Sequence, residues 1–140
     1  MYAPNVDGAT GLLNTNYKGK ADTAIKLLDE YDFVFVHLEA PDECGHQGDL
    51  DGKIKAIELI DEKILTPIFK ALDGKEDFRI MVLPDHRTPI AVRTHTSEPV
   101  PYFIYDSRVE KIGCKYDEIT AEGTGVYIDT PWQLTEKFFS

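Results

Sequence analysis

The sequence is short of cysteine, of basic side chains and of long apolar runs, and each shortage excludes a class of protein. Its two cysteines, Cys44 and Cys114, are too few for a disulfide framework, so we expect a reduced, cytoplasmic setting. No apolar run approaches the roughly 20 residues of a membrane span, and the first residues lack the pattern of a signal peptide. A formal net charge of −10 argues against a nucleic acid or an anionic membrane as partner, because both bind basic surfaces.

Helical patterns occupy several parts of the chain. Apolar residues recur three and four positions apart from about residue 17 to 31 and again over 50–72, which predicts two amphipathic helices. Asp49 is suited to cap the second helix at its start, and Pro67 should kink or restart it. Shorter helices are expected near 116–122 and after Thr130, where Pro131 follows a capping residue.

Three short apolar runs predict strands between these helices. They cover residues 32–38, 78–83 and 100–105, and the first two read as strands buried on both faces. Alternating strands and helices indicate an α/β fold with a mostly parallel sheet. Residues 1–16, with their glycines, asparagines and threonines, are expected to form a loop or arm, and the length of 140 residues predicts one domain.

A polar loop, residues 39–49, follows the first apolar run and contains a carboxylate and an imidazole. Asp42 and His46 are four residues apart, so on a helical turn or a tight loop both can reach one cation. Binding sites of α/β proteins collect in the loops beyond the carboxyl ends of the strands, where this loop is expected to lie. The neighbouring Glu39 and Glu43 are not counted as ligands, since acidic loop residues are abundant in this chain, and His37 reads as a structural residue.

A second polar loop, residues 84–99, repeats the combination. Asp85 and His86 are adjacent, so they can share an ion only on a loop, because adjacent strand residues point to opposite faces. His95 adds a third imidazole. A single loop histidine is usually an ordinary surface residue, but the grouping favours a metal site. Mixed oxygen and nitrogen ligands suit Zn²⁺ or Mn²⁺ better than Ca²⁺, and two such ions could clamp a phosphoryl group.

Arg93, two residues before His95, is the candidate for holding a phosphate. Its guanidinium offers a fixed pair of donors that matches phosphate oxygens. The alternative, an ordinary salt bridge on an acidic protein, carries equal weight.

The two polar loops resemble those of a known enzyme family. Residues 36–49 resemble the Asp-x-x-Gly-His metal loop of the cofactor-independent phosphoglycerate mutases, in the form of the archaeal-type branch. Residues 83–89 resemble the Asp-His metal pair of the family, and residues 93–97 resemble its last metal histidine. The opening, residues 8–21, also resembles that branch. These enzymes belong to the alkaline phosphatase superfamily.

The resemblance implies two divalent metal ions, manganese or zinc. Asp42, His46 and His95 would hold one ion, and Asp85 with His86 would hold the other. It also implies an alkaline-phosphatase-like, three-layer, mostly parallel sheet with helices on both faces. The implied activity is the isomerase reaction of glycolysis that interconverts 2-phosphoglycerate and 3-phosphoglycerate, through a serine that carries the phosphoryl group.

The sequence departs from the family in one respect. The nucleophilic serine of these enzymes lies in their N-terminal part, and the serines here are Ser97, Ser107 and Ser140. Residues 1–140 are therefore expected to correspond to the C-terminal, metal-binding portion, to be incomplete at the N-terminal side of the sheet and to be inactive alone. An exposed sheet edge would favour self-association. The alternatives are a related phosphotransferase or phosphatase, of the kind labelled homoserine kinase or phosphonopyruvate decarboxylase, and a noncatalytic metal-binding module.

Overall fold

The computed structural model describes residues 2–75, 77–110 and 113–140. The chain divides into two compact units. The first unit comprises Met1–Gly74 with Thr88–His95, and the second comprises Lys75–Arg87 with Thr96–Ser140. No helix in the described ranges combines the length and the apolar character that crossing a membrane requires.

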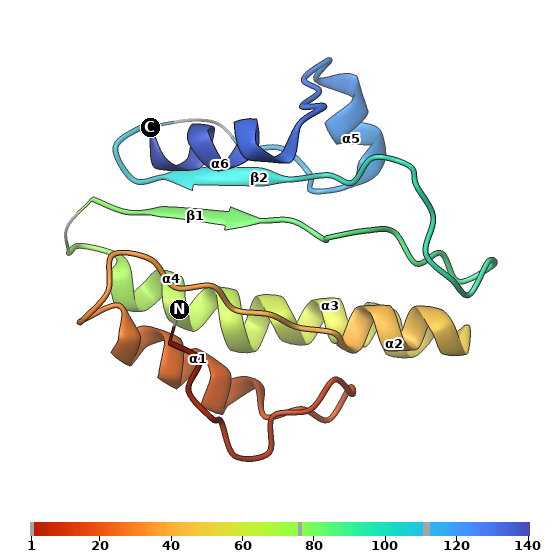
Figure 1. The fold of residues 1–140 in the computed structure, drawn as a ribbon, viewed down its shortest axis with the longest axis horizontal. Helices are drawn as coiled ribbons and strands as arrows, with labels where there is room; N and C mark the ends of the chain where they lie inside the picture. The colour runs from red at the N-terminus through yellow and green to blue at the C-terminus, as the bar shows by residue number, and fades with distance from the viewer. Residues whose placement is uncertain (1, 76, 111–112) are drawn as a thin grey trace. The chain divides into compact units, whose positions relative to one another are not determined.

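The first unit is built on a long helical rod. Its parts are α3 (Leu50–Ile60), a π-helical segment (Asp61–Leu65) and α4 (Thr66–Leu72), which follow one another without a break (Figure 1). The π segment precedes Pro67, whose ring would clash with the carbonyl one ordinary turn earlier. The Thr66 amide instead donates to the Asp61 carbonyl, five residues back, so the wider turn accommodates the proline. The interruption predicted at Pro67 is thus a π turn.

A helix, α2 (Ala40–Gln47), occupies most of the region that was expected to be a polar loop. Pro41 lies in its first turn, where a missing amide hydrogen costs nothing, and two carboxylates there complement the helix dipole. Gly48 closes the helix in the left-handed conformation, at φ 70°. The side chain of Asp49 then caps α3 by accepting from the Gly52 amide at 2.9 Å, as predicted. The loop prediction was wrong because these end signals of α2, Pro41 and Gly48, lie only seven residues apart.

The first apolar run is extended, but it joins no strand ladder among the described residues, so the prediction of a strand buried on both faces is wrong. Its side chains alternate in exposure: Val34, Val36 and Leu38 are half-buried, whereas Phe35 is 66% exposed. Figure 1 shows this segment running along the helical rod. A ladder requires a neighbouring strand to take up the backbone hydrogen bonds, and the sheet of the described chain consists of β1 and β2 alone.

The core of the first unit lies between α1 (Tyr17–Leu27) and the helical rod. Tyr17, Ala21 and Ile64 are buried there, and Val36 and Leu38 pack against them. Asn16 starts α1 by accepting from the Gly19 amide at 2.8 Å, and residues 2–16 form turns and loop, as predicted. The apolar face of α1 therefore has the role that its periodicity predicts.

The second unit contains the sheet. Strand β1 (Arg79–Val82) pairs antiparallel with β2 (Phe103–Asp106), with Arg79 opposite Asp106 and Val82 opposite Phe103. Two helices follow, α5 (Glu118–Gly123) and α6 (Pro131–Phe139), close to the predicted positions. Helices and a sheet confirm an α/β protein, while the three-layer, mostly parallel arrangement stays a prediction.

An ionic cluster links the two strands with α6. The Asp106 carboxylate accepts from Arg79 and from Arg108, each at 2.6 Å. Arg79 also donates to the Phe138 carbonyl at 2.7 Å. The guanidinium of Arg108 and then that of Arg79 hold the pKa of Asp106 well below its usual range. Deprotonated Asp106 therefore stabilises the second unit.

We expect the stability of the second unit to fall in acid because of Asp106. Its folded pKa is depressed, so its contribution is present above the unfolded value of about 3.9 and is lost as the pH falls below it. Asp106→Asn should remove this part of the acid dependence. The measurement is urea unfolding between pH 7 and pH 3, followed by the fluorescence of Trp132, the single tryptophan. Glu136→Gln is the control and should keep the wild-type slope; an equally steep slope in Asp106→Asn would contradict the assignment.

Candidate metal centre

Helix α2 places two potential metal ligands on one of its faces. Asp42 and His46 are one helical turn apart, so their side chains lie over each other. The Nε2 atom of His46 is 3.4 Å from Oδ2 of Asp42. Both side chains are partly open to solvent, at 30% exposure for Asp42 and 36% for His46. The spacing that the sequence indicated therefore acts through a helix rather than a loop.

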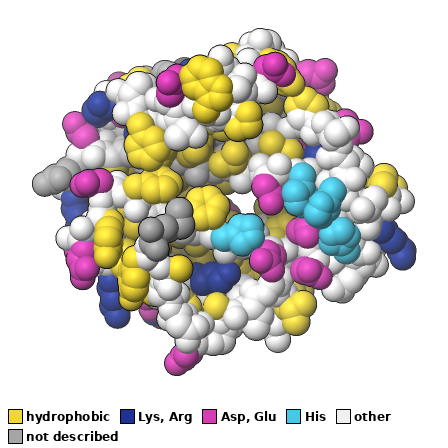
Figure 2. Space-filling view, viewed as in Figure 1, with side chains coloured by type: hydrophobic (Ala, Val, Ile, Leu, Met, Phe, Trp, Pro, Cys, Tyr) yellow, Lys and Arg dark blue, Asp and Glu magenta, His cyan; other side chains and the backbone are white. Residues whose placement is uncertain are grey.

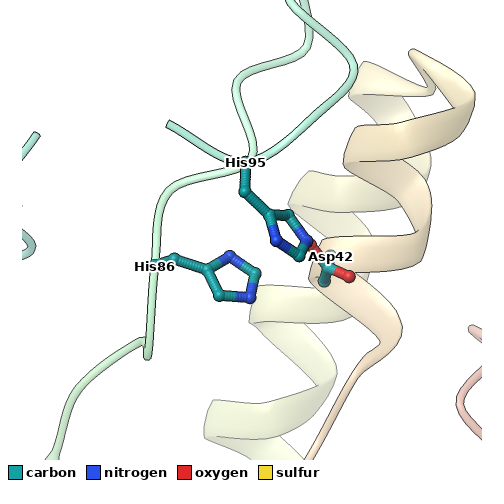
Figure 3. A group of neighbouring side chains, drawn as sticks. All are labelled: Asp42, His86 and His95. Atoms are coloured by element: carbon teal, nitrogen blue, oxygen red, sulfur yellow. The ribbon is translucent and has the colours of Figure 1, made fainter. Parts of the chain in front are cut away.

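The third ligand comes from the loop segment Thr88–His95 of the same unit. Nε2 of His95 lies 3.4 Å from Oδ1 of Asp42 and 3.1 Å from Nε2 of His46. Figure 3 shows the imidazole of His95 turned toward Asp42, and both residues belong to a group of potential metal ligands. Residues 49 positions apart in sequence thus meet at one point.

The spacing of the donor atoms of these three residues fits the coordination shell of a transition metal. With metal–nitrogen distances of about 2.0–2.1 Å, neighbouring donors lie about 3.3 Å apart in a tetrahedral shell and about 2.9 Å apart in an octahedral shell. The two imidazole Nε2 atoms lie 3.1 Å apart. Each lies 3.4 Å from one carboxylate oxygen of Asp42, His46 from Oδ2 and His95 from Oδ1. One carboxylate and two imidazoles form a donor set suited to zinc or manganese. The residues therefore fit a divalent metal ion.

The hydrogen bond on the far side of His46 fixes which of its nitrogens can bind a metal. Nδ1 of His46 lies 3.0 Å from the carbonyl oxygen of Arg93. A carbonyl only accepts, so Nδ1 must carry the hydrogen, and the neutral ring then has its lone pair on Nε2. Nε2 is the atom that faces Asp42 and His95. Such outer contacts commonly orient metal-binding histidines.

Thr88 supports Asp42 and was not among the predicted site residues. It is buried, and its hydroxyl donates to Oδ1 of Asp42. Its carbonyl accepts from Lys53 of α3 at 2.7 Å. The sequence offered only a threonine near two ligands, and loop hydroxyls of that kind commonly serve the loop itself. Burial and the contact with Asp42 are what distinguish Thr88, and neither can be read from the sequence.

Gly45 allows the Thr88 segment to lie close to α2. A Cβ atom at Gly45 would lie 2.6 Å from the Thr88 carbonyl oxygen and 2.9 Å from its Cγ2. Both separations are shorter than normal contacts, so a larger residue cannot occupy this position without moving the backbone. The glycine between Asp42 and His46 therefore sets the distance between the helix and the loop that carries His95.

The other predicted ligand pair lies in the second unit, on the loop after β1. Nε2 of His86 is 3.4 Å from Oδ2 of its neighbour Asp85, whose side chain is 71% exposed. The His86 amide also donates to Asp85 at 3.1 Å. An isolated bridge between Arg87 and Thr96 follows directly. The side chains of Asp85 and His86 thus lie close together. A loop permits this, whereas adjacent residues of a strand point to opposite faces. Figure 3 also labels His86.

Two further candidates have contacts of their own. The guanidinium of Arg93 lies against Gly48, at the end of α2. His37 lies 3.4 Å from a carboxylate oxygen of Glu39, and its carbonyl accepts from Lys20. His37 thus has a structural partner, in line with its interpretation from the sequence. Figure 2 shows histidine side chains beside carboxylates on the surface.

Residues 1–129 match the Metalloenzyme superfamily, which is almost the whole chain. The chain belongs to this superfamily. A donor set of one carboxylate and two imidazoles is in keeping with that membership.

Curated relatives of this chain carry a more specific name than that of the superfamily. The chain is 56% identical over 101 residues to the 2,3-bisphosphoglycerate-independent phosphoglycerate mutase of Methanosarcina acetivorans, covering 71% of this chain and 25% of that protein. It is 41% identical over 133 residues to a probable enzyme of the same name from Geobacter sulfurreducens, covering 94% of this chain and 33% of that protein.

A solved structure, that of the PH0037 protein from Pyrococcus horikoshii, is also similar. It shares 40% identity and a TM-score of 0.67, over 72% of this chain and 30% of that one. The chain therefore spans a quarter to a third of the length of these relatives.

Proposed function

We propose that this chain is the metal-binding portion of a 2,3-bisphosphoglycerate-independent phosphoglycerate mutase. The observation that carries the proposal is the convergence of Asp42, His46 and His95 at separations that fit one metal ion. The relatives named above support the choice of reaction, and the phosphoglycerates are the proposed substrates. The reaction interconverts 2-phosphoglycerate and 3-phosphoglycerate by transferring a phosphoryl group.

The proposal assigns two divalent ions, manganese or zinc, to the five predicted ligands. Asp42, His46 and His95 would hold one ion, and Asp85 with His86 would contribute to the other. When bound, such ions neutralise phosphoryl oxygens and lower the pKa of an attacking hydroxyl. The side chains of this chain would orient the ions: Thr88 holds the Asp42 carboxylate, and the Arg93 carbonyl holds the His46 ring. The serine that accepts the phosphoryl group is proposed to come from outside this sequence.

The extended segment of residues 33–38 supports the proposal that the complete enzyme has a larger, three-layer sheet. Residues 33–38 are extended, alternate in exposure and run along helices, yet take part in no ladder among the described residues. Figure 2 shows many apolar side chains on the surface, and Phe35, Tyr127 and Ile119 are at least 66% exposed. We propose that further strands pair with this segment in the complete enzyme, and that the chain alone self-associates through it.

Metal binding tests the first half of the proposal. Calorimetric titration of the 140-residue chain with Zn²⁺ or Mn²⁺ should show binding. The double variant His46→Ala, His95→Ala should bind at least ~100-fold more weakly, because two of three nitrogen and oxygen donors are removed and loss of even an outer partner costs about 10–100-fold. His37→Ala is the control and should bind as wild type. Equal binding by the wild type and the double variant would disprove the assigned ligands.

A chimaeric enzyme tests the second half. The corresponding portion of the Methanosarcina acetivorans mutase would be replaced by this chain, which is 56% identical to it over the matched 101 residues. The chimaera should convert 3-phosphoglycerate, and the chain alone should not. The chimaera carrying His46→Ala and His95→Ala should lose nearly all turnover. A chimaera that binds metal but has no mutase turnover would refute the reaction and leave the metal site intact.

A further inference from the structure

Arg93 has an unusual backbone conformation next to the proposed metal centre. Its φ is 59°, and it is the one non-glycine residue with a positive φ among the residues described. The left-handed conformation is unfavourable for a residue with a Cβ, because the Cβ then lies too close to the following carbonyl oxygen. Strain of this kind persists only where the surroundings hold it, and it tends to occur at functional sites.

Two contacts hold Arg93 in this conformation. Its amide donates to the Pro89 carbonyl at 2.9 Å. Its guanidinium lies against Gly48, where an added Cβ would be 2.5 Å from Nε and 2.7 Å from Cζ. Gly48 is itself left-handed, at φ 70°, a conformation that favours glycine. A cation at the carboxyl end of α2 also complements the helix dipole. Arg93 and the last turn of α2 therefore interlock.

The contacts of Arg93 with the end of α2 affect His46, which lies in the last turn of that helix. The strained backbone directs the Arg93 carbonyl to Nδ1 of His46, at 3.0 Å. We propose that Arg93 is a positioning residue: its left-handed backbone fixes His46 with the hydrogen on Nδ1 and the lone pair on Nε2. Nε2 then faces Asp42 and His95. This role rests on the proposed metal-binding function, but the tautomer of His46 is a property of the metal-free chain.

The role differs from the one that the sequence suggested for Arg93. A phosphate-binding arginine acts through its guanidinium, so every substitution that removes the charge should be equally harmful. A positioning arginine acts through its backbone, so the outcome should depend on whether the new residue adopts the left-handed conformation. Glycine and asparagine adopt it readily, and β-branched valine does not.

The experiment compares Arg93→Gly, Arg93→Asn and Arg93→Val in the 140-residue chain. The first readout is the tautomer of His46 in the metal-free chain at pH 8, from the ring ¹⁵N shifts, assigned by the loss of signals in His46→Gln. The second readout is the affinity for Zn²⁺ alone. Val92→Gly is the control, because it loosens the neighbouring position of the same exposed loop without changing residue 93. Circular dichroism confirms that each variant is folded.

We expect the hydrogen on Nδ1 of His46 in the wild type, in Arg93→Gly, in Arg93→Asn and in Val92→Gly. Zinc affinity should stay within about threefold in these variants, whereas Arg93→Val should shift the tautomer toward Nε2–H and lose about tenfold or more in affinity. Two results would overturn the proposal: a wild-type His46 with its hydrogen on Nε2, or losses in the glycine and asparagine variants as large as that of valine. If Arg93→Val does not fold, the wild-type tautomer and the glycine and asparagine variants still test the proposal.

The failure of the proposed reaction can be told apart from the failure of this inference. Loss of mutase turnover in the chimaera with an intact His46 tautomer would refute the proposed reaction and leave the role of Arg93 standing.

Discussion

Replacing Gly45 with alanine is expected to destabilise the first unit and to weaken metal binding, although alanine is the better helix former. Inside a helix, alanine is favoured over glycine by about 1 kcal/mol. Against this, the new methyl group would lie 2.6 Å from the Thr88 carbonyl oxygen and 3.0 Å from its Cβ. These atoms are backbone or close to it, so they cannot rotate away. Overpacking of this kind costs typically ~1–3 kcal/mol.

The collision also reaches the proposed metal centre. Moving Thr88 away from α2 disturbs its hydrogen bond to Asp42 and its contact with Lys53, and it shifts the segment that carries His95. We therefore expect a net loss of up to about 2 kcal/mol in unfolding free energy and a loss of tenfold or more in zinc affinity. Denaturant unfolding and calorimetry measure the two quantities.

Gly123 supplies the matched control for this substitution. It also lies in a helix, α5, but a Cβ there would meet nothing within 4 Å. Gly123→Ala should therefore be neutral or slightly stabilising, by up to about 1 kcal/mol. If Gly45→Ala were stabilising to the same degree, the close approach of Thr88 to α2 would not exist in solution.

The helical part of the fold could be predicted because its signals are local. Asn16 and Asp49 cap helices within three residues of themselves, and the apolar stripe of α1 is complete in its own sequence. Helix α2 was missed although its end signals are local too, because a proline and a glycine seven residues apart also describe a loop. The prediction of a strand over residues 32–38 was wrong for a different reason, since a ladder depends on a partner strand that no single segment specifies.

The same division applies to the candidate site. Asp42, His46 and His95 could be named as candidate ligands from the sequence, because metal binding requires particular side chains and those are visible there. The structure brings the three side chains together. Thr88 and the Arg93 carbonyl were not, because their roles come from where the backbone runs. A carbonyl group occurs in every residue, so the one that fixes His46 becomes visible only once the fold brings it within hydrogen-bonding distance. The hydrogen bonds that orient the candidate ligands are thus harder to predict from a sequence than the ligands themselves.

Adding the metal should protect helix α2 in the first unit against hydrogen exchange and leave helix α6 in the second unit largely unchanged. The three ligands that converge within one unit come from α2 and from the segment Thr88–His95. A ligand at 100 times its dissociation constant stabilises the form that binds it by about 2.7 kcal/mol, which corresponds to a slowing of about 100-fold for amides that exchange through opening of the site. We expect this slowing in α2, measured by mass spectrometry with Zn²⁺ and with a chelator.

Helix α6 and the double variant show whether this protection comes from the assigned ligands. Helix α6 lies in the second unit, so its amides should exchange at nearly the same rate with and without metal. In His46→Ala, His95→Ala, the protection of α2 should disappear while the exchange of α6 stays as in the wild type. Equal protection of α2 and α6 by the metal would mean that the two units unfold together. Protection of α2 that survives in the double variant would place the metal on other residues.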